Sequence, residues 1–354
     1  MTANRSVFIL GSGFSRAFSE AMPTVAELTD VLRGNPRFQE APYDDLVASP
    51  ELLLSYLDSA QPWKEPEEVL RDQALFIETQ RQLAAEIARC EGEAFGQPAP
   101  EWAARLVKHL HETRSTVLSL NYDTVLERIV HKTSTERSDH DEPREFDLYQ
   151  MPLSVLRLRQ AGTLGGNSVQ TLRLLKLHGS INWFYSGQDA TPGEQIYYRA
   201  VMSDSPAGDD WGRGNTTDRE IRRLTSDKAP LIVPPVSEKS RFYDNRTLRM
   251  LWTDAREALA RANEVWCVGY SLPETDLTMK LFLQSVARPE RVYVVNRASS
   301  VNGKEDRILE RYREAFPHSA IDGQNFMSND SVKAMTEHLL GRASQPSPKQ
   351  QPTS

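Results

Sequence analysis

Cysteine is scarce in this chain: the 354 residues contain two, Cys90 and Cys267, far apart in the sequence. Two cysteines cannot build a four-cysteine zinc ribbon, and they define no disulfide framework. The seven histidines are scattered without metal-ligand spacing. We therefore expect no metal site, and the low cysteine usage fits a reducing cytoplasm.

Long apolar runs and an excess of positive charge are also missing. The apolar run at residues 7–10 is too short for the core of a signal peptide. No stretch approaches the roughly 20 apolar residues of a membrane-spanning helix. The formal net charge of −7 argues against a broad basic surface for nucleic acid or anionic lipid. We expect a soluble cytoplasmic protein that binds neither nucleic acid nor membrane directly.

A polar triplet, Asn121-Tyr122-Asp123, lies where a predicted strand passes into a predicted helix. Residues 115–120 form a short apolar and β-branched run, typical of a buried parallel strand. Residues 125–130 carry apolar side chains at helical spacing. Ligands of open α/β sheets bind beyond the carboxyl ends of the strands, so Asn121 faces the expected site. The alternative is that Asn121 only satisfies the turn and Asp123 only caps the helix.

A glycine-bearing turn, Gly11-Ser12-Gly13, follows the first predicted strand at residues 6–10. Such a turn lets the backbone approach a bound phosphate, and the amides of the following helix start can point at the anion. The fit to GxGxxG is partial, because Arg16 stands at the position of the third glycine. Ser15 and Arg16 could add contacts to the phosphates. The alternative is a glycine turn with no ligand.

A histidine, His178, follows the apolar strand predicted at residues 172–177 and precedes Gly179, which is small enough to let a ligand approach. Histidine near its unperturbed pKa suits general base catalysis at neutral pH, although a lone histidine is more often structural. The joint signal is stronger, since five predicted strands end in polar or glycine residues. These residues are Gly11, Asn121, His178, Gly269 and Asn296.

The order of predicted elements indicates an α/β fold with a Rossmann-like parallel sheet. Strands are predicted at 6–10, 115–120, 172–177, 197–202, 231–233, 265–268 and 291–295, the last of which closes the sheet. Helices are predicted at 24–32, within 50–90, and at 102–111, 248–262, 305–315 and 330–340. A doubly wound fold has one crossover helix between its first two strands, so the helical block at about 24–112 is interpreted as an inserted subdomain. We expect one catalytic domain, residues 1–342, with a surface insertion at about 131–171 and a disordered tail at 343–354.

Taken together, these residues make the chain resemble the sirtuin-like NAD-hydrolysing domains of prokaryotic antiphage defence systems, over most of residues 5–300. Three segments near the expected reaction centre carry the likeness. Gly11–Ser15 is similar to the family's GAGxS loop, Asn121–Asp123 to its QNxD-type segment, and Leu177–Gly179 to its catalytic histidine and following glycine. Further along the chain, Gly269–Leu272 is similar to the GTSL-type loop, and Val294–Asn296 to the late strand ending in asparagine.

The resemblance implies cleavage of NAD to ADP-ribose and nicotinamide. In that chemistry Asn121 would position the nicotinamide ribose or the attacking water, and His178 would act as the base. Asp123 would stabilise the cationic sugar or hold the nicotinamide carboxamide. The residues implied to contact NAD are Gly11, Ser12, Gly13, Phe14, Ser15, Asp123, Gly179, Gly269, Tyr270, Ser271 and Asn296.

The departures from the resemblance concern protein deacylation. Deacylating sirtuins carry a four-cysteine zinc module, which two cysteines cannot supply, and a GIPDFR-type segment, where this chain reads Ala21-Met22-Pro23-Thr24. NAD hydrolysis is therefore favoured. The alternatives are a sirtuin-type deacylase or ADP-ribosyltransferase, and a non-catalytic module that senses NAD or ADP-ribose. We also expect a homo-oligomer built through the helical block, and a separately encoded partner such as an ATPase or nuclease could complete the system.

Overall fold

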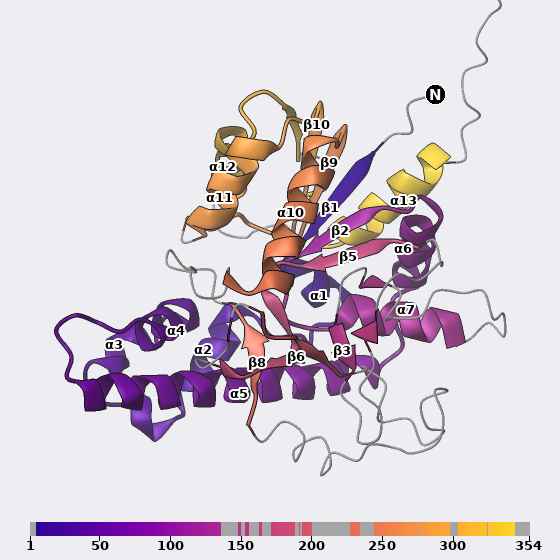
Figure 1. Ribbon diagram of the computed structural model, residues 1–354. Coiled ribbons are helices and arrows are strands. Elements are labelled where there is room, and N and C mark those ends of the chain that lie inside the picture. Colours follow the sequence, from indigo (N-terminus) through magenta and orange to yellow (C-terminus); the bar gives the residue numbers. More distant parts are fainter. Residues whose placement is uncertain are drawn as a thin grey trace, which may run out of the picture.

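The computed structural model of the protein is shown in Figure 1. Its description covers residues 5–135, 148–149, 153–155, 163–164, 171–187, 191, 193–199, 227–233, 244–274, 276–297, 304–323 and 325–343. Most of the predicted insertion at 131–171 and nearly all of the predicted tail at 343–354 lie outside these residues.

A six-stranded sheet, in which every neighbouring pair of strands is parallel, forms the centre of the molecule. Its order is β11-β10-β9-β1-β2-β5. If these six strands are renumbered one to six along the chain and read from β5 to β11, their order across the sheet is three-two-one-four-five-six. This is the order of doubly wound dinucleotide-binding folds. The strands are β1 (Ser6–Leu10), β2 (Thr116–Ser119), β5 (Arg173–Lys176), β9 (Glu264–Val268), β10 (Arg291–Val295) and β11 (Ala320–Asp322).

Helices cover both faces of this sheet, which explains why its strands are apolar on both sides. In Figure 1, α10, α11 and α12 lie on one side and α6, α7 and α13 on the other. Residues 7–10 of β1 and 265–268 of β9 are accordingly all buried. The helices of the second half of the chain are α7 (Val125–Thr135), α10 (Arg246–Ala260), α11 (Leu277–Val286), α12 (Lys304–Ala315) and α13 (Ser331–Ala343).

The predicted α/β fold is confirmed, with one correction at the edge of the sheet. The prediction that residues 291–295 close the sheet was wrong, because β11 pairs with β10 beyond them. β11 is three residues long and none of them is buried, so the apolar run that signals an inner strand is missing.

A helical block separates β1 from β2, as predicted. The sequence pattern at 50–90 runs across two helices, since Ser49 caps the first and Pro66 begins the second. The block comprises α1 (Ser12–Phe18), α2 (Val25–Arg33), the 3-10 turn η1 (Pro36–Phe38), α3 (Tyr43–Leu46), α4 (Pro50–Asp58), α5 (Pro66–Phe95) and α6 (Glu101–Glu112). Within the described residues, we find no helix whose length and apolar content together would allow it to cross a membrane.

A second, smaller sheet was not predicted. The strands predicted at 197–202 and 231–233 overlap two strands of this sheet and are not part of the parallel sheet. The order of the second sheet is β4-β3-β7-β6-β8, and it packs against the long helix α5, which runs beside it in Figure 1. Gln80 of α5 donates a hydrogen bond to the carbonyl of Ile232 in this sheet. Its strands are β3 (Leu153–Val155), β4 (Thr163–Leu164), β6 (Gly179–Tyr185), β7 (Tyr197–Tyr198) and β8 (Ala229–Ile232).

Candidate active site at the carboxyl edge of the sheet

The glycine turn lies where the strand order of the parallel sheet reverses, between β1 and β9. Three backbone hydrogen bonds continue the ladder past the strand ends. Gly11 donates to Val268 over 2.9 Å, Leu120 donates to Leu10 over 2.9 Å, and Gly269 donates to Val295 over 2.7 Å. Because all six strands are parallel, the five residues Gly11, Asn121, His178, Gly269 and Asn296 lie at one edge of the sheet.

Gly13 and Gly269 are in backbone contact, and this contact explains why both are glycine. The amide of Gly13 donates to the carbonyl of Gly269 over 2.9 Å. A Cβ on Gly13 would lie 2.7 Å from the Cα of Gly269, and one on Gly11 would lie 2.7 Å from its carbonyl oxygen. Gly269 also has a φ of 65°, which disfavours a side chain. The absence of side chains at these positions therefore lets the two loops approach closely enough to form this hydrogen bond.

The side chain of Asn121 joins the end of β2 to the glycine turn. It is buried, and its amide nitrogen donates to the carbonyl of Gly11 over 3.0 Å and to the hydroxyl of Ser15 over 3.1 Å. Ser15 in turn donates to Asp123 over 2.7 Å. The amide of Asn121 therefore has a structural part to play, as the alternative reading of the sequence expected.

Asp123 has both carboxylate oxygens engaged. One accepts from Ser15, and the other accepts from the backbone amide of Val125 over 3.1 Å, at the start of α7. Burial raises the pKa of Asp123 above its usual range, and the nearby Lys176 ammonium together with these hydrogen bonds opposes the rise. The capping role predicted for this residue is thus present alongside its bond to Ser15.

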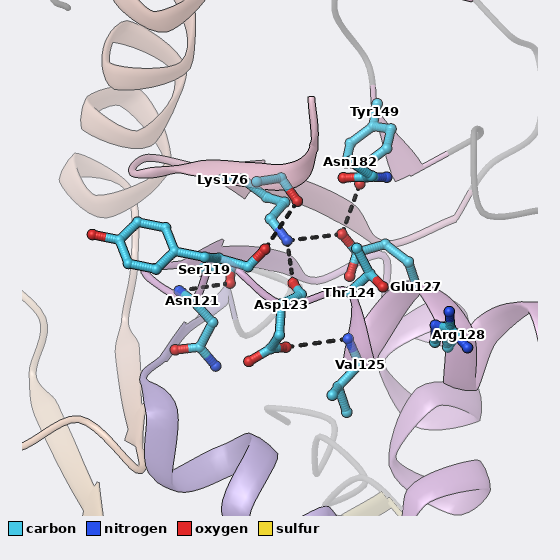
Figure 2. Close-up of polar contacts among 12 residues, drawn as sticks. Ser119, Asn121, Asp123, Thr124, Val125, Glu127, Arg128, Tyr149, Lys176 and Asn182 are labelled. Carbon is cyan, nitrogen blue, oxygen red and sulfur yellow. Dashed lines mark hydrogen bonds and ion pairs between the residues drawn. The ribbon is translucent and has the colours of Figure 1, made fainter. Parts of the chain in front are cut away.

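A buried ion pair lies behind the Asn121-Tyr122-Asp123 segment (Figure 2). The ammonium of Lys176, in β5, pairs with Glu127 of α7 over 3.0 Å and donates to the carbonyl of Asp123. Tyr149 donates its hydroxyl proton to the same Glu127 oxygen over 2.7 Å. Since the Lys176 side chain is 1% exposed and that of Glu127 2%, water does not screen their attraction. The Lys176–Glu127 pair therefore positions the Asn121-Tyr122-Asp123 segment through the carbonyl of Asp123.

Glu91 reaches this region from α5 of the helical block. Its carboxylate accepts from both the backbone amide and the hydroxyl of Thr124, and it lies 3.2 Å from Arg128. Burial, followed by the neighbouring Asp123 carboxylate, raises the pKa of Glu91 to about 7. The helical block therefore caps the helix that follows the polar triplet.

His178 and Asn121 follow neighbouring strands at equivalent positions. The parallel register pairs Ser119 with Lys176, and each of the two polar residues comes two positions later. His178 is 3% exposed, and its carbonyl accepts from Val233 over 2.9 Å. The carboxyl ends of β2 and β5 thus bring the two predicted catalytic residues to adjacent strand ends.

Gly179 begins β6 with a φ of 78°. A Cβ at this position would lie 2.0 Å from the carbonyl oxygen of Leu231 in β8. The glycine is therefore accounted for by the tight reversal from β5 into the second sheet. The predicted approach of a ligand is not needed to explain it.

The loop after β9 is fixed by its own hydrogen bonds. Tyr270 is buried and donates to Asp276 over 2.8 Å, while its carbonyl accepts from Tyr312 over 2.6 Å. Ser271 is partly exposed, and Leu272 has a φ of 47°, a conformation that few residues with a side chain adopt. This loop keeps its shape at the cost of backbone strain.

Two other predicted positions make contacts within the protein. The Phe14 side chain is 1% exposed and packs edge-on against Trp102, with ring centroids 5.8 Å apart. The Arg16 guanidinium pairs with Glu20 and Glu27, at 3.1 and 3.3 Å, so its charge is already balanced.

Asn296 ends β10, and its backbone bonds to the segment before α13. Its amide donates to Phe326 over 3.0 Å, and its carbonyl accepts from Ser328 over 3.1 Å. Ser12, by contrast, begins α1 as an exposed residue. Ser12 and Asn296 both lie at the carboxyl edge of the sheet.

The sequence analysis missed Lys176, Glu127 and Glu91. Lys176 carried a usable signal, because it is a lone charge inside an otherwise apolar strand, and such a charge is almost always paired when buried. Glu127 and Glu91 lie on helices where a carboxylate is ordinary, so their pattern gave no such signal.

No protein-family model matches the chain, and no curated protein matches it by sequence. Among solved structures, the chain is similar to Sir2 in complex with the inhibitor EX-527, 2'-O-acetyl-ADP-ribose and deacetylated p53 peptide. The sequence identity is 13% and the TM-score is 0.38, over 96% of this chain and 94% of that chain. The fold class stated above rests on the strand order of the parallel sheet.

Proposed function

We propose that the protein hydrolyses NAD to ADP-ribose and nicotinamide. The observation that carries the proposal is the strand order of the parallel sheet, with a glycine turn at its point of reversal. Dinucleotides bind at this point in folds of the same order. Gly11 and Gly13, after β1, and Gly269, after β9, flank this point, and the close contact between the two loops requires that these residues have no side chain.

The two polar strand ends suit cleavage of an N-glycosidic bond. Positive charge develops on the ribose as the nicotinamide leaves, as in other glycosyl transfers. Asn121 would position that ribose or the attacking water, and His178 would accept the proton of the water or of a ribose hydroxyl. Their places after β2 and β5 put them on one side of the glycine turn.

Preorganisation supports the same reading. Asn121, Ser15 and Asp123 hold one another through hydrogen bonds of 2.7 to 3.1 Å, and Lys176 holds the carbonyl of Asp123 from the buried side. A polar site whose groups are already oriented needs little rearrangement when the reaction occurs. Since both oxygens of Asp123 are engaged by the protein, we assign Asp123 to positioning Ser15 and Asn121.

The biological setting follows from the motif resemblance. We propose that the enzyme is the NAD-depleting effector of an antiphage defence system of the abortive infection type, acting in the cytoplasm. Its two cysteines cannot form the four-cysteine zinc module of deacylating sirtuins, which favours hydrolysis over transfer of an acyl group.

Product analysis tests the proposal. The purified protein is incubated with NAD, with and without an acylated peptide, and the products are separated by chromatography. Hydrolysis predicts nicotinamide and ADP-ribose in both samples. Acyl transfer that requires the peptide would identify a deacylase, ADP-ribosylated protein would identify a transferase, and NAD binding without turnover would identify a sensing module.

A histidine variant tests the assigned base. His178→Ala and His178→Gln should each lower NAD turnover by about a hundredfold or more, the usual effect of removing a positioned general base. His318→Ala is the matched control, because His318 is exposed. Near wild-type turnover by a folded His178 variant would show that His178 is not the base.

A further inference from the structure

A cavity of about 650 Å³ opens at the amino edge of the parallel sheet, opposite the candidate active site. The first residues of β1, β2, β5 and β9 line it, together with the ends of α6 and α13 and one side of α10. Strands of four or five residues at roughly 3.3 Å per residue put it about 15 Å from the glycine turn. It is therefore separate from the candidate active site.

The cavity wall is rich in arginine. Its charged residues are the five arginines Arg5, Arg114, Arg173, Arg261 and Arg342 and the three acids Asp254, Glu257 and Glu264. Each acid is paired with one arginine. The pairs are Arg173 with Asp254, Arg261 with Glu257 at 3.3 Å, and Arg342 with Glu264 at 2.8 Å.

Two guanidinium groups remain. Within the part of the chain that the structure describes, Arg5 and Arg114 have no carboxylate partner, so the wall carries two positive charges in excess. The remaining titratable group is His109, and burial lowers its pKa, which favours its neutral form. A concave surface with unbalanced arginines attracts anions more strongly than a flat one.

The backbone at Arg114 supports a role for its side chain. The helix α6 ends in a Schellman motif, in which Ser115 donates to Leu110 and Arg114 donates to His111, each over 3.0 Å. Arg114 has a φ of 52° at the position that glycine usually occupies in this motif. An arginine here accepts a disfavoured backbone conformation, and Arg114 is one of the residues that line the cavity.

We propose that this cavity binds a small phosphate-bearing ligand, with Arg5 and Arg114 as its counter-charges. A guanidinium group can donate two parallel hydrogen bonds to a phosphate, and two guanidinium charges balance the two negative charges of a diphosphate diester. The hydroxyl of Thr116, at the start of β2, also lines the wall. A volume of about 650 Å³ lies within the range of small-molecule sites. A ligand bound in this cavity would not compete with a ligand bound at the candidate active site.

Calorimetric titration with inorganic pyrophosphate tests the proposal on the full chain. The wild type should bind pyrophosphate, and Arg5→Gln and Arg114→Gly should each weaken binding by about tenfold or more, since each removes a charged contact. Arg105→Gln is the matched control, because Arg105 is exposed on α6 and does not line the cavity. Its affinity should equal that of the wild type.

Arg114→Gly also separates a ligand role from a structural one. Glycine suits a φ of 52°, so this variant should keep or raise the melting temperature, by about 1–3 °C, while it loses pyrophosphate affinity. A wild type that does not bind pyrophosphate would overturn the proposal. So would binding that persists when both Arg5 and Arg114 are replaced, because that binding belongs elsewhere on the molecule.

Discussion

Replacing Lys176 with methionine should destabilise the protein strongly. Methionine fills most of the space of the lysine stem but carries no charge, so among the described residues the buried carboxylate of Glu127 would keep the hydroxyl of Tyr149 as its hydrogen-bond partner. Breaking a buried ion pair from one side costs about 3–5 kcal/mol, because a charge is left in a site without water. The carbonyl of Asp123 would also lose its donor. We therefore expect the free energy of unfolding to fall by at least about 3 kcal/mol.

Urea unfolding at pH 7, followed by circular dichroism, measures this loss. Lys176→Met/Glu127→Leu should recover much of it, because the double variant buries no charge. Lys280→Met is the control, since the Lys280–Glu314 pair is partly exposed and surface pairs contribute about 0–1 kcal/mol. A Lys176→Met protein within about 1 kcal/mol of the wild type, or a double variant less stable than the single one, would refute the reasoning.

Three further outcomes are expected. Glu91 keeps its proton up to a pKa of about 7 when folded but releases it near its ordinary value when unfolded, so the contribution of Glu91 to stability should fall by roughly 3 kcal/mol as pH rises from 4 to 8. Urea titrations should show this slope reduced in Glu91→Gln; equal slopes would contradict it. Gly13→Ala should lower the melting temperature, because its Cβ would meet Gly269, and an unchanged value would disprove that contact. We also expect self-association through the helical block, where Trp63 is 71% exposed, so light scattering across a concentration series should show an oligomer that Trp63→Ser weakens; a wild type that stays monomeric would contradict this.

The parallel sheet could be predicted well from the sequence. Its inner strands are buried on both faces, so each of them requires a continuous run of apolar residues. The runs around residues 6–10, 265–268 and 291–295 are of this kind. The short edge strand β11 and the second sheet were not predicted, although the strands predicted at 197–202 and 231–233 overlap β7 and β8 of that sheet. Their strands are two to seven residues long, and their pairing depends on contacts distant in the sequence.

The sequence predicted which residues lie at the candidate site, but it did not predict the contacts that these residues make with one another. Polar strand ends were visible, since Asn121 and His178 each follow an apolar run. The hydrogen bonds of Asn121 to Gly11 and Ser15 were not, because they join residues 110 and 106 positions apart. The contact between Gly13 and Gly269 likewise depends on two strands that are neighbours only in the folded sheet.

The helix α5 connects two parts of the molecule that the chain itself keeps far apart. Gln80 holds the second sheet at the carbonyl of Ile232, and Glu91 holds the start of α7 at Thr124. Eleven residues of one rigid helix separate these contacts, about 16 Å at 1.5 Å per residue. The helix α5 therefore connects the second sheet to the loop that carries Asn121. Deleting the helical block would remove the contacts that Glu91 makes with that loop.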